Sequence, residues 1–322
     1  MTVTREPFSV GIVQAAPVCF DADACLSRIE DLAADAARRG ARLVAVGETW
    51  LPGYPSWIDS SPGAMLWDNP ANKEAFAVYR ENSVTVPGPH HERLSRLARS
   101  LGVVLVVGAS EAVDVGPGQG TLYNALLTYD ADGSLVNHHR KLVPTYTERT
   151  IWGPGDASGL HASDTAVGRV SSLVCWEHWM PLPRQLLHES GELVHVAVWP
   201  WVHEKHLLAS RHYAFEGRCF VLAVGQIQRG SDIPPGLGRA EGVGEDDLML
   251  RGGSCVIAPD ASLMTEPLLD DEGVIVAEID PRMRDRETMT LDVTGHYHRP
   301  ELLGTYVDYG DRATSLPPAV DG

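Results

Sequence analysis

The chain has 322 residues, which is long enough to build one large α/β domain with a substantial core. Hydrophobic residues make up 44% and charged residues 21%, and this globular composition excludes disorder as the main state. The 26 lysines and arginines are outnumbered by 43 aspartates and glutamates, which gives a net charge of −17. Nucleic acid and anionic membrane surfaces are not expected as partners, because their phosphates would be repelled.

The cysteines and the apolar runs indicate the cellular compartment. The five cysteines are an odd number without a Cys-x-x-Cys pair, so neither a disulfide framework nor a cysteine zinc site is predicted. The N-terminus lacks the apolar segment of a secretory signal, and no run of about 18 apolar residues would span a membrane. We therefore expect a soluble, cytoplasmic protein.

The first half of the chain predicts alternating strands and helices. Residues 8–15 form a strand, residues 21–39 a helix, and residues 41–47 a second buried strand that ends at Glu48. This order implies a parallel pair of strands. After a long loop, whose length favours a functional role, the remaining predictions are helices at 73–81 and 90–100, a strand at 103–107, and a hairpin of strands 123–129 and 135–141.

The second half has a similar order of elements. After a loop at 144–163, a strand leads to Cys175, and the elements that follow are a helix at 183–190, a strand at 193–199, a helix at 206–218, a strand at 220–224, a loop at 228–247, and strands at 254–258 and 274–279. Two halves of similar order, with no long linker between them, predict two sheets covered by helices in an α/β fold.

Three residues that could carry chemistry follow predicted strands. Glu48, Lys141 and Cys175 each stand at a strand end, where open α/β folds tend to place their ligands. A thiol needs a base, and a substrate that develops negative charge needs a nearby cation, so a glutamate and a lysine would complete a cysteine nucleophile. Taken singly, each residue is better explained as a cap, a solvated edge residue or a core thiol. Their shared position favours catalysis.

Sequence motifs surround the three residues. They are Gly-Glu-Thr-Trp-Leu-Pro-Gly-Tyr-Pro at 47–55, His-Arg-Lys-Leu-Val-Pro-Thr at 139–145 and Cys-Trp-Glu at 175–177. In order and spacing they resemble the Glu, Lys and Cys motifs of the nitrilase (carbon-nitrogen hydrolase) superfamily. Further matches, which extend the resemblance over nearly the whole chain, lie at 146–149, 152–156, 211–218 and 295–301. Cys-Trp-Glu resembles the nitrilase branch, because amidase-type members more often carry Cys-Tyr-Asp.

The resemblance implies a four-layer α-β-β-α sandwich, two copies of which pack through helices into an α-β-β-α-α-β-β-α dimer. It implies a single nitrilase domain over residues 1–295 and a C-terminal extension at 296–322 that takes part in subunit contacts. The expected assembly is a homodimer or a higher homo-oligomer, including spirals. Neither a cofactor nor a metal is implied.

The resemblance also implies hydrolysis of a small organic nitrile to the carboxylic acid and ammonia, through a thioimidate and a thioester on the cysteine. Glu48 would accept the proton of Cys175, while Lys141 and the backbone N–H of Trp176 would stabilise the charged species. Glu148 resembles the second glutamate of the family, which would hold Lys141 or the substrate in position.

Aromatic residues near the motifs predict an apolar pocket that suits an aryl or alkyl nitrile. The predicted substrate-binding residues are Trp50, Tyr54, Trp57, Trp176 and Trp199. Most tryptophans in a domain of this size simply pack, and the convergence of several on one pocket mouth is what favours binding. Cyanide stays a candidate substrate, since cyanide-degrading relatives share the motifs.

Other functions stay open. An amidase, a carbamoylase, or a cyanide-hydrolysing or cyanide-hydrating enzyme would use the same three residues, whereas a non-catalytic binding or filament-forming protein would not need them. The 13 histidines suggest a metal site, but none has a His-Glu-x-x-His or comparable spacing. Glu177 follows the nucleophile closely, and we expect it to have a structural role.

Overall fold

Strands and helices alternate along the computed structural model, which describes residues 6–234 and 236–303. The elements up to the middle of the chain are β1 (Phe8–Gln14), α1 (Ala22–Arg38), β2 (Ala41–Leu51), α2 (Trp57–Ser60), α3 (Pro70–Glu81), α4 (Pro89–Leu101), β3 (Val104–Ala112), β4 (Leu122–Tyr129), β5 (Leu135–Arg140) and the 3-10 helix η1 (Tyr146–Thr150). The elements that follow are β6 (Ser163–Thr165), β7 (Gly168–Val174), the 3-10 helix η2 (Cys175–Trp179), α5 (Pro181–Glu189), β8 (Val194–Val198), α6 (Glu204–Gly217), β9 (Phe220–Val224), β10 (Ile227–Arg229), the 3-10 helix η3 (Gly230–Asp232), β11 (Leu248–Ile257), β12 (Leu268–Leu269), β13 (Gly273–Ile279) and α7 (Arg282–Glu287).

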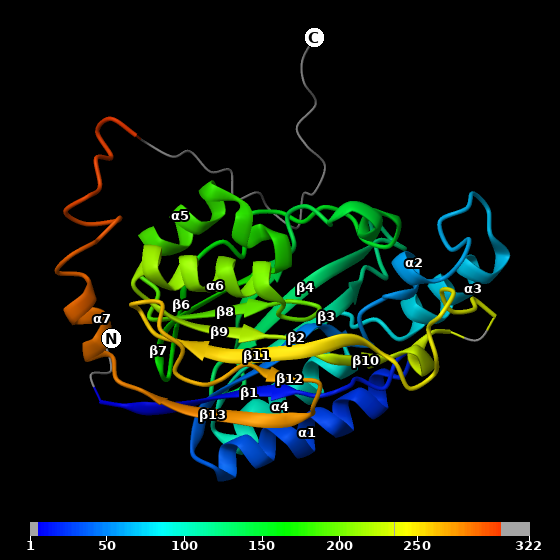
Figure 1. The fold of residues 1–322 in the computed structure, drawn as a ribbon, viewed down its shortest axis with the longest axis horizontal. Helices are drawn as coiled ribbons and strands as arrows, with labels where there is room; N and C mark the ends of the chain where they lie inside the picture. Colours follow the sequence, from blue (N-terminus) through cyan, green and yellow to red (C-terminus); the bar gives the residue numbers. More distant parts are fainter. Residues whose placement is uncertain (1–5, 235, 304–322) are drawn as a thin grey trace.

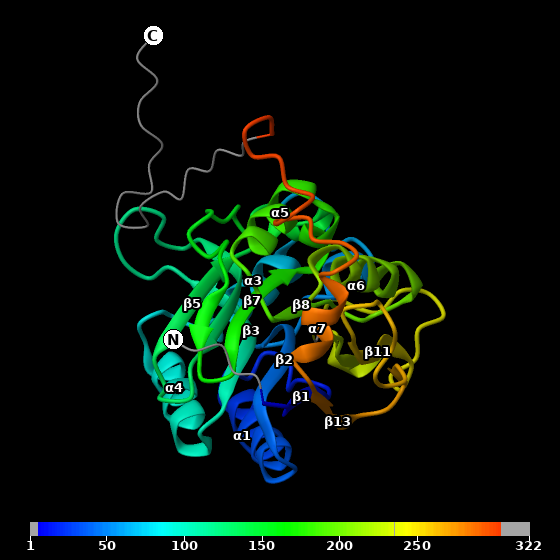
Figure 2. The same ribbon diagram turned by 90° about the vertical axis from the view of Figure 1, so that its left-hand side faces the viewer.

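Two sheets lie face to face between two layers of helices (Figure 1). The first sheet has the order β13-β1-β2-β3-β4-β5, and the second has the order β10-β11-β9-β8-β7-β6 with β12 beside β11. Helices α1 and α4 cover the first sheet, while α5 and α6 cover the second, as the view turned by 90° also shows (Figure 2). The predicted α-β-β-α sandwich is confirmed.

Strand β13 departs from the expected division into two halves. It returns from the C-terminal part of the chain and pairs antiparallel with β1, with Val10 opposite Ala277. The predicted parallel pairing of β1 with β2 is confirmed. Because β13 belongs to the first sheet, that sheet contains strands from both halves of the chain.

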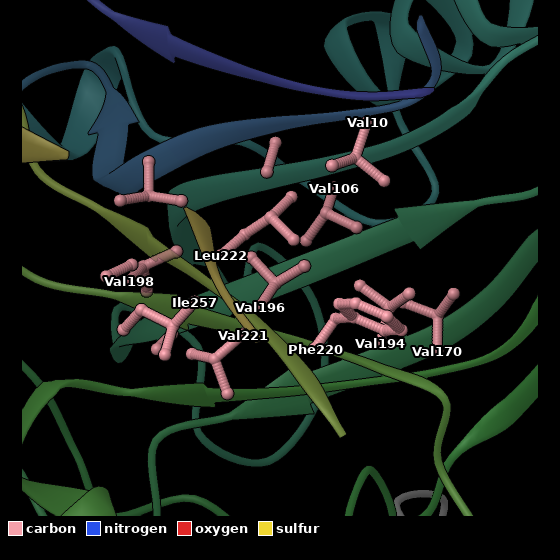
Figure 3. Close-up of a cluster of buried hydrophobic side chains, with 14 of the residues drawn as sticks. Val10, Val106, Val170, Val194, Val196, Val198, Phe220, Val221, Leu222 and Ile257 are labelled. Atoms are coloured by element: carbon pink, nitrogen blue, oxygen red, sulfur yellow. The ribbon is translucent and has the colours of Figure 1, made fainter. Parts of the chain in front are cut away.

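The core explains why most strands are apolar along their whole length. On β3, Val104 and Val106 face the second sheet, whereas Leu105 and Val107 face the helices. Valines of both sheets fill the space between them, for example Val106 opposite strand β8 (Figure 3). Strands that are buried on both faces need apolar side chains at successive positions, so their sequences show no alternation.

The loop predicted at 49–72 is shorter than expected. Helix α2 lies within it, and α3 begins at Pro70, where the side chain of Asn69 accepts hydrogen bonds from the backbone N–H groups of Ala71 and Asn72. An Asn cap followed by a proline at the first helical position is a strong start signal for a helix. The sequence analysis placed this start three residues too late.

The cysteines and the helices can be compared with the sequence directly. All five cysteines are free thiols, and each lies in the part of the chain that the structure describes. In that same part, none of the helices combines the length and the apolar character that crossing a bilayer requires.

Candidate active site

Glu48 projects inward from an irregular segment of β2. The strand continues to Leu51, so the prediction that it ends at Glu48 is wrong; the pairing with β3 instead shifts register between Val46 and Leu51. Thr49 has a φ of 42°, which marks the distortion. Gly108 on β3 lies against the backbone of residues 47 and 48. A Cβ at position 108 would stand only 2.1 Å from the carbonyl oxygen of Gly47. A glycine at 108 is therefore required for this position of Glu48.

Lys141 follows the last residue of β5 and is fully enclosed by the protein. Its Nζ donates to Oε1 of Glu48 at 3.0 Å and to Oε2 of Glu148 at 2.6 Å. Its backbone N–H donates to the carbonyl oxygen of Asn124 at 2.8 Å, which continues the pairing of β4 and β5. The lysine thus bridges two carboxylates that come from different elements.

Glu148 lies in η1 and is held on both of its oxygens. Oε2 accepts the backbone N–H of Thr145 at 2.7 Å in addition to the ammonium group of Lys141. Oε1 accepts the hydroxyl of Tyr54 at 3.0 Å. These contacts fix the carboxylate of Glu148, and through it the ammonium group of Lys141.

Cys175 is the first residue after β7 and has a φ of 53°, the left-handed conformation that residues other than glycine seldom adopt. Its side chain is buried, and its Sγ and one carboxylate oxygen each of Glu48 and Glu148 lie within 4.8 Å of one another. The structure therefore brings together all four residues that the sequence analysis proposed as catalytic.

Burial decides the charge state of these groups. Complete burial raises the pKa of Glu48 to about 7, although the nearby charge of Lys141 opposes the shift. Burial and the charge of Glu48 raise the pKa of the Cys175 thiol well above 9.0. Burial alone would lower the pKa of Lys141, but Glu48, Cys175 and Glu148 together raise it above 10.5. At neutral pH the site holds a neutral thiol, a cationic lysine and a partly ionised Glu48.

Glu177 connects the segment after β5, which contains Lys141, with the end of β7, which precedes Cys175. Its carboxylate accepts the backbone N–H of Leu142 at 2.8 Å and the backbone N–H of Val174 at 2.8 Å. It also pairs with the ring of His139. Burial alone would raise the pKa of Glu177, but His139 and these N–H groups have the larger effect, so the pKa is lowered. Both carboxylate oxygens are occupied by these contacts, as expected for a structural residue.

Two further side chains orient Glu48, and the sequence analysis missed both. Nδ2 of Asn124 on β4 donates to Oε1 of Glu48 at 2.8 Å, and Nε2 of Gln226 donates to the backbone carbonyl oxygen of Glu48 at 2.7 Å. The other carboxylate oxygen of Glu48, Oε2, has no hydrogen-bond partner within the described residues. An amide in an apolar strand, as in Tyr-Asn-Ala-Leu-Leu, was the available signal for Asn124.

The predicted substrate-binding aromatics lie in different places. Trp50 and Trp199 are completely buried, and their indole N–H groups donate to the carbonyl oxygen of Ala15 and to Ser210. Trp57 is buried in a cluster with Phe20 and Tyr79. Tyr54 contacts Glu148, and the side chain of Trp176 is 54% exposed beside the nucleophile. Of the five, Tyr54 contacts a candidate catalytic side chain, and Trp176 directly follows Cys175 in the chain.

One set of metal-ligating side chains stands out among residues 6–234 and 236–303, namely Glu48, Glu148 and Cys175. The ammonium group of Lys141 already lies between the two carboxylates at hydrogen-bond distance. A bound cation would compete with this charge, so the donor set suits proton transfer better than metal binding.

A buried thiol, a carboxylate with a raised pKa and a fixed cation lie together in an α-β-β-α sandwich, and these are the groups that a hydrolase with a cysteine nucleophile requires. The family model described as carbon-nitrogen hydrolase matches residues 9–286. The chain therefore belongs to the carbon-nitrogen hydrolase family, and the family prediction is confirmed.

Curated relatives cover nearly the whole chain. It is 36% identical to Nitrilase 2 of an unknown prokaryotic organism, over 94% of this chain and 93% of the relative. It is 36% identical to an aliphatic nitrilase of Rhodococcus rhodochrous, over 98% of this chain and 86% of the relative. A bifunctional nitrilase/nitrile hydratase of Nicotiana tabacum is 35% identical, with coverage of 92% and 84%. These relatives all carry the name nitrilase.

The solved structures support the fold. A carbon-nitrogen hydrolase from Helicobacter pylori G27 aligns with a TM-score of 0.70 over 94% of this chain and 99% of its own. The sequence identity is 19%, so this similarity bears on the architecture alone.

Proposed function

We propose that this protein is a nitrilase that hydrolyses a small organic nitrile to the carboxylic acid and ammonia. The proposal is supported by nitrilase-named relatives that cover nearly the whole chain and by the grouping of Glu48, Lys141, Glu148 and Cys175. The observation that carries it is the buried carboxylate of Glu48 within 4.8 Å of the Cys175 thiol, because this places a base next to the nucleophile; burial raises the pKa of that carboxylate.

The first half of the reaction forms a thioimidate. As the sulfur of Cys175 attacks the nitrile carbon, Glu48 accepts the thiol proton and the nitrile nitrogen gains charge, which Lys141 and the N–H of Trp176 stabilise. The proton then passes to that nitrogen, so a carbon–sulfur bond has replaced one bond of the carbon–nitrogen triple bond. Because the resting thiol is neutral, deprotonation accompanies attack rather than preceding it.

The second half releases both products. Water adds to the thioimidate carbon, the nitrogen leaves as ammonia with a proton from Glu48, and a thioester remains. A second water, activated by Glu48, hydrolyses the thioester to the acid and restores the thiol of Cys175. Glu148 contributes by holding Lys141 in place, and its own oxygens are occupied by hydrogen bonds.

The substrate class follows from the surface beside the nucleophile. A groove of about 400 Å³ is lined mostly by apolar and aromatic side chains, with Thr145, Arg149 and Glu177 as its polar members; the others are Val143, Pro144, Tyr146, Trp176, Trp179 and Met180. Such a surface favours an aryl or alkyl group next to the nitrile rather than a charged group. Tyr54 and Trp176 stay our proposed substrate contacts, whereas we assign Trp50, Trp57 and Trp199 to packing.

Release of the amide is a second candidate outcome. The Nicotiana tabacum relative is named a bifunctional nitrilase/nitrile hydratase, which motivates a measurement of both products. If the tetrahedral species expels the sulfur of Cys175 instead of ammonia, the amide leaves and the thiol is restored. The ratio of amide to acid, measured by chromatography, separates the two outcomes.

The decisive experiment compares the wild type with Cys175→Ala on a panel of nitriles and the matching amides. Ammonia release from nitriles by the wild type and none by the variant is expected, together with a covalent adduct on the Cys175 peptide when a slow nitrile is used. Cys219→Ala is the matched control, because Cys219 is equally buried but lies near Glu192 and away from the site. Activity on amides alone would contradict the nitrilase proposal.

We further propose a cytoplasmic homo-oligomer in which α6 packs against a second subunit. Leu208 and Phe215 of α6 are 61% and 47% exposed, which is unusual for large apolar side chains on one helix face. The C-terminal extension at 296–322 is a further predicted contact, although residues 304–322 lie outside the described part of the chain. Light scattering of Leu208→Glu tests this assembly, with a fall in mass expected.

A further inference from the structure

A chain of buried hydrogen bonds runs from the nucleophile into the protein interior. Nδ1 of His178, in η2, lies 2.7 Å from the carbonyl oxygen of Cys175. The other ring nitrogen, Nε2, lies 3.0 Å from Nε2 of His195 on β8. Nδ1 of His195 lies 2.7 Å from the hydroxyl of Ser171 and 3.3 Å from a carboxylate oxygen of Glu192. The five residues are buried.

The acceptor at one end of this chain fixes the protons of His178. A carbonyl oxygen only accepts, so Nδ1 of His178 carries a proton and donates it. Burial, and next the neighbouring His195, lower the pKa of His178 well below 6.5, so its ring is neutral and Nε2 is an acceptor. Nε2–H of His195 is then the donor to His178. The hydroxyl of Ser171 lies 2.7 Å from Nδ1 of His195 and donates to the carboxylate of Glu192.

The carbonyl that His178 holds belongs to the peptide unit between Cys175 and Trp176. The C=O and N–H groups of a trans peptide lie in one plane and point in opposite directions. The N–H of that unit, from Trp176, donates to the sulfur of Cys175. A hydrogen bond that fixes the carbonyl on the buried side therefore also fixes the direction of the N–H on the reactive side.

We propose that His178 and His195 are positioning residues that set the plane of the Cys175–Trp176 peptide and thereby aim the N–H of Trp176 at the charge that forms on the substrate. This rests on the proposed function, in which that N–H assists Lys141. The left-handed φ of 53° at Cys175 makes the support necessary, because an unsupported residue would relax toward a more favourable backbone conformation and turn the N–H away.

Other roles for the two histidines fit the surroundings less well. The ring of Tyr213 stacks on His195 at 3.7 Å, and the ring of Trp199 lies 4.7 Å from His178, so aromatic side chains separate both from solvent and substrate. Within the described ranges, neither histidine belongs to a group of three metal-ligating side chains. The pair touches the reaction only through the backbone of Cys175.

The test uses amide side chains that replace one ring nitrogen at a time. His178→Asn keeps an N–H near the position of Nδ1 and so keeps the donor to Cys175, whereas His178→Gln places its amide near the position of Nε2 and loses that donor. We expect kcat to fall by about 10²-fold in His178→Gln with KM little changed, and by less than about 10-fold in His178→Asn, because displacing one such donor costs about this much.

A second pair of variants covers the case in which the first pair does not fold. His195→Gln keeps a donor toward His178 and His195→Asn loses it, so kcat should be higher in the Gln variant, the reverse of the order at position 178. Alkylation of Cys175 by iodoacetamide should continue in every folded variant, since Glu48 is untouched.

Two results would overturn the positioning role. One is a loss of kcat that is equal in the Asn and Gln variants at each position and follows their fall in Tm. The other is a wild-type kcat in His178→Gln. Full turnover by Cys175→Ala would instead overturn the proposed function, so the two failures are distinguishable.

Discussion

Asn124→Leu should move the pH at which the enzyme becomes active. The amide of Asn124 donates to Glu48 at 2.8 Å and stabilises its ionised form, so removing it raises the pKa of Glu48 above its value of about 7. A hydrogen bond to a charged group contributes about 1.5–3 kcal/mol, and about 1.4 kcal/mol corresponds to one pH unit. The lower limb of the profile of kcat/KM against pH should therefore shift upward by about one to two units.

The assay is ammonia release from one nitrile measured across the pH range. With a midpoint near 7 in the wild type, the shift predicts a fall of about 5- to 50-fold in kcat/KM at neutral pH, recovered in alkaline buffer. Asn137→Leu is the matched control, because Asn137 is a buried amide on the neighbouring strand that donates to the carbonyl oxygen of Gly159 instead. A loss in Asn124→Leu that is the same at every pH would refute the reasoning.

Three other predictions concern charge, space and stability. Glu148→Gln should shift the same limb downward by about two units, because two carboxylates within 4.8 Å at an effective dielectric of about 20 repel by about 3 kcal/mol. Gly108→Ala should lower kcat by about 10²-fold, since its Cβ would meet the backbone at 2.1 Å, whereas Gly47→Ala, with 3.5 Å of space, should retain activity. Burial alone would lower the pKa of His188, but its partners Glu192 and Glu216 raise it to about 9. His188 should therefore stabilise the fold fully below pH 6.5 and lose this effect as the pH rises through about 9. The loss of unfolding free energy in His188→Gln, on the order of 3 kcal/mol in urea at acidic pH, should then shrink in alkaline buffer.

Much of the fold could be predicted because each strand and helix carries its own local signal. The helix predicted from 21 to 39 had Asp21 or Asp23 as its cap and Gly40 as its stop, and the structure places α1 at Ala22–Arg38 with Asp21 as the cap. The pairing of β13 with β1 was not predictable in this way. It joins residues 259 to 271 positions apart, from Gln14 with Gly273 to Phe8 with Ile279, and the apolar pattern of either strand fits several neighbours equally well.

The candidate catalytic residues could be predicted for a different reason from the residues that support them. Cys175 and Lys141 follow apolar strands directly and Glu48 follows an apolar run within one, so the local pattern of the sequence indicates their positions. Asn124 contacts Glu48 across the fold, 76 residues away in the chain, whereas His178 contacts Cys175 only three residues away. The direction of both side chains depends on which face of a strand or turn they occupy. An apolar pattern shows burial, but it does not show the partner of a buried polar group.

The charges in the site favour Glu48 over Glu148 as the proposed base. Lys141 lies between the two carboxylates and donates to both, so one cation is shared by two acids in a buried site. Glu148 receives two further hydrogen bonds, from Thr145 and Tyr54, whereas Oε2 of Glu48 has no partner within the described residues. Burial raises the pKa of Glu48 to about 7, so its less supported carboxylate can take up a proton near neutral pH. That carboxylate also lies beside the thiol, and we therefore expect it to receive the proton of Cys175 while Glu148 stays bound to the lysine.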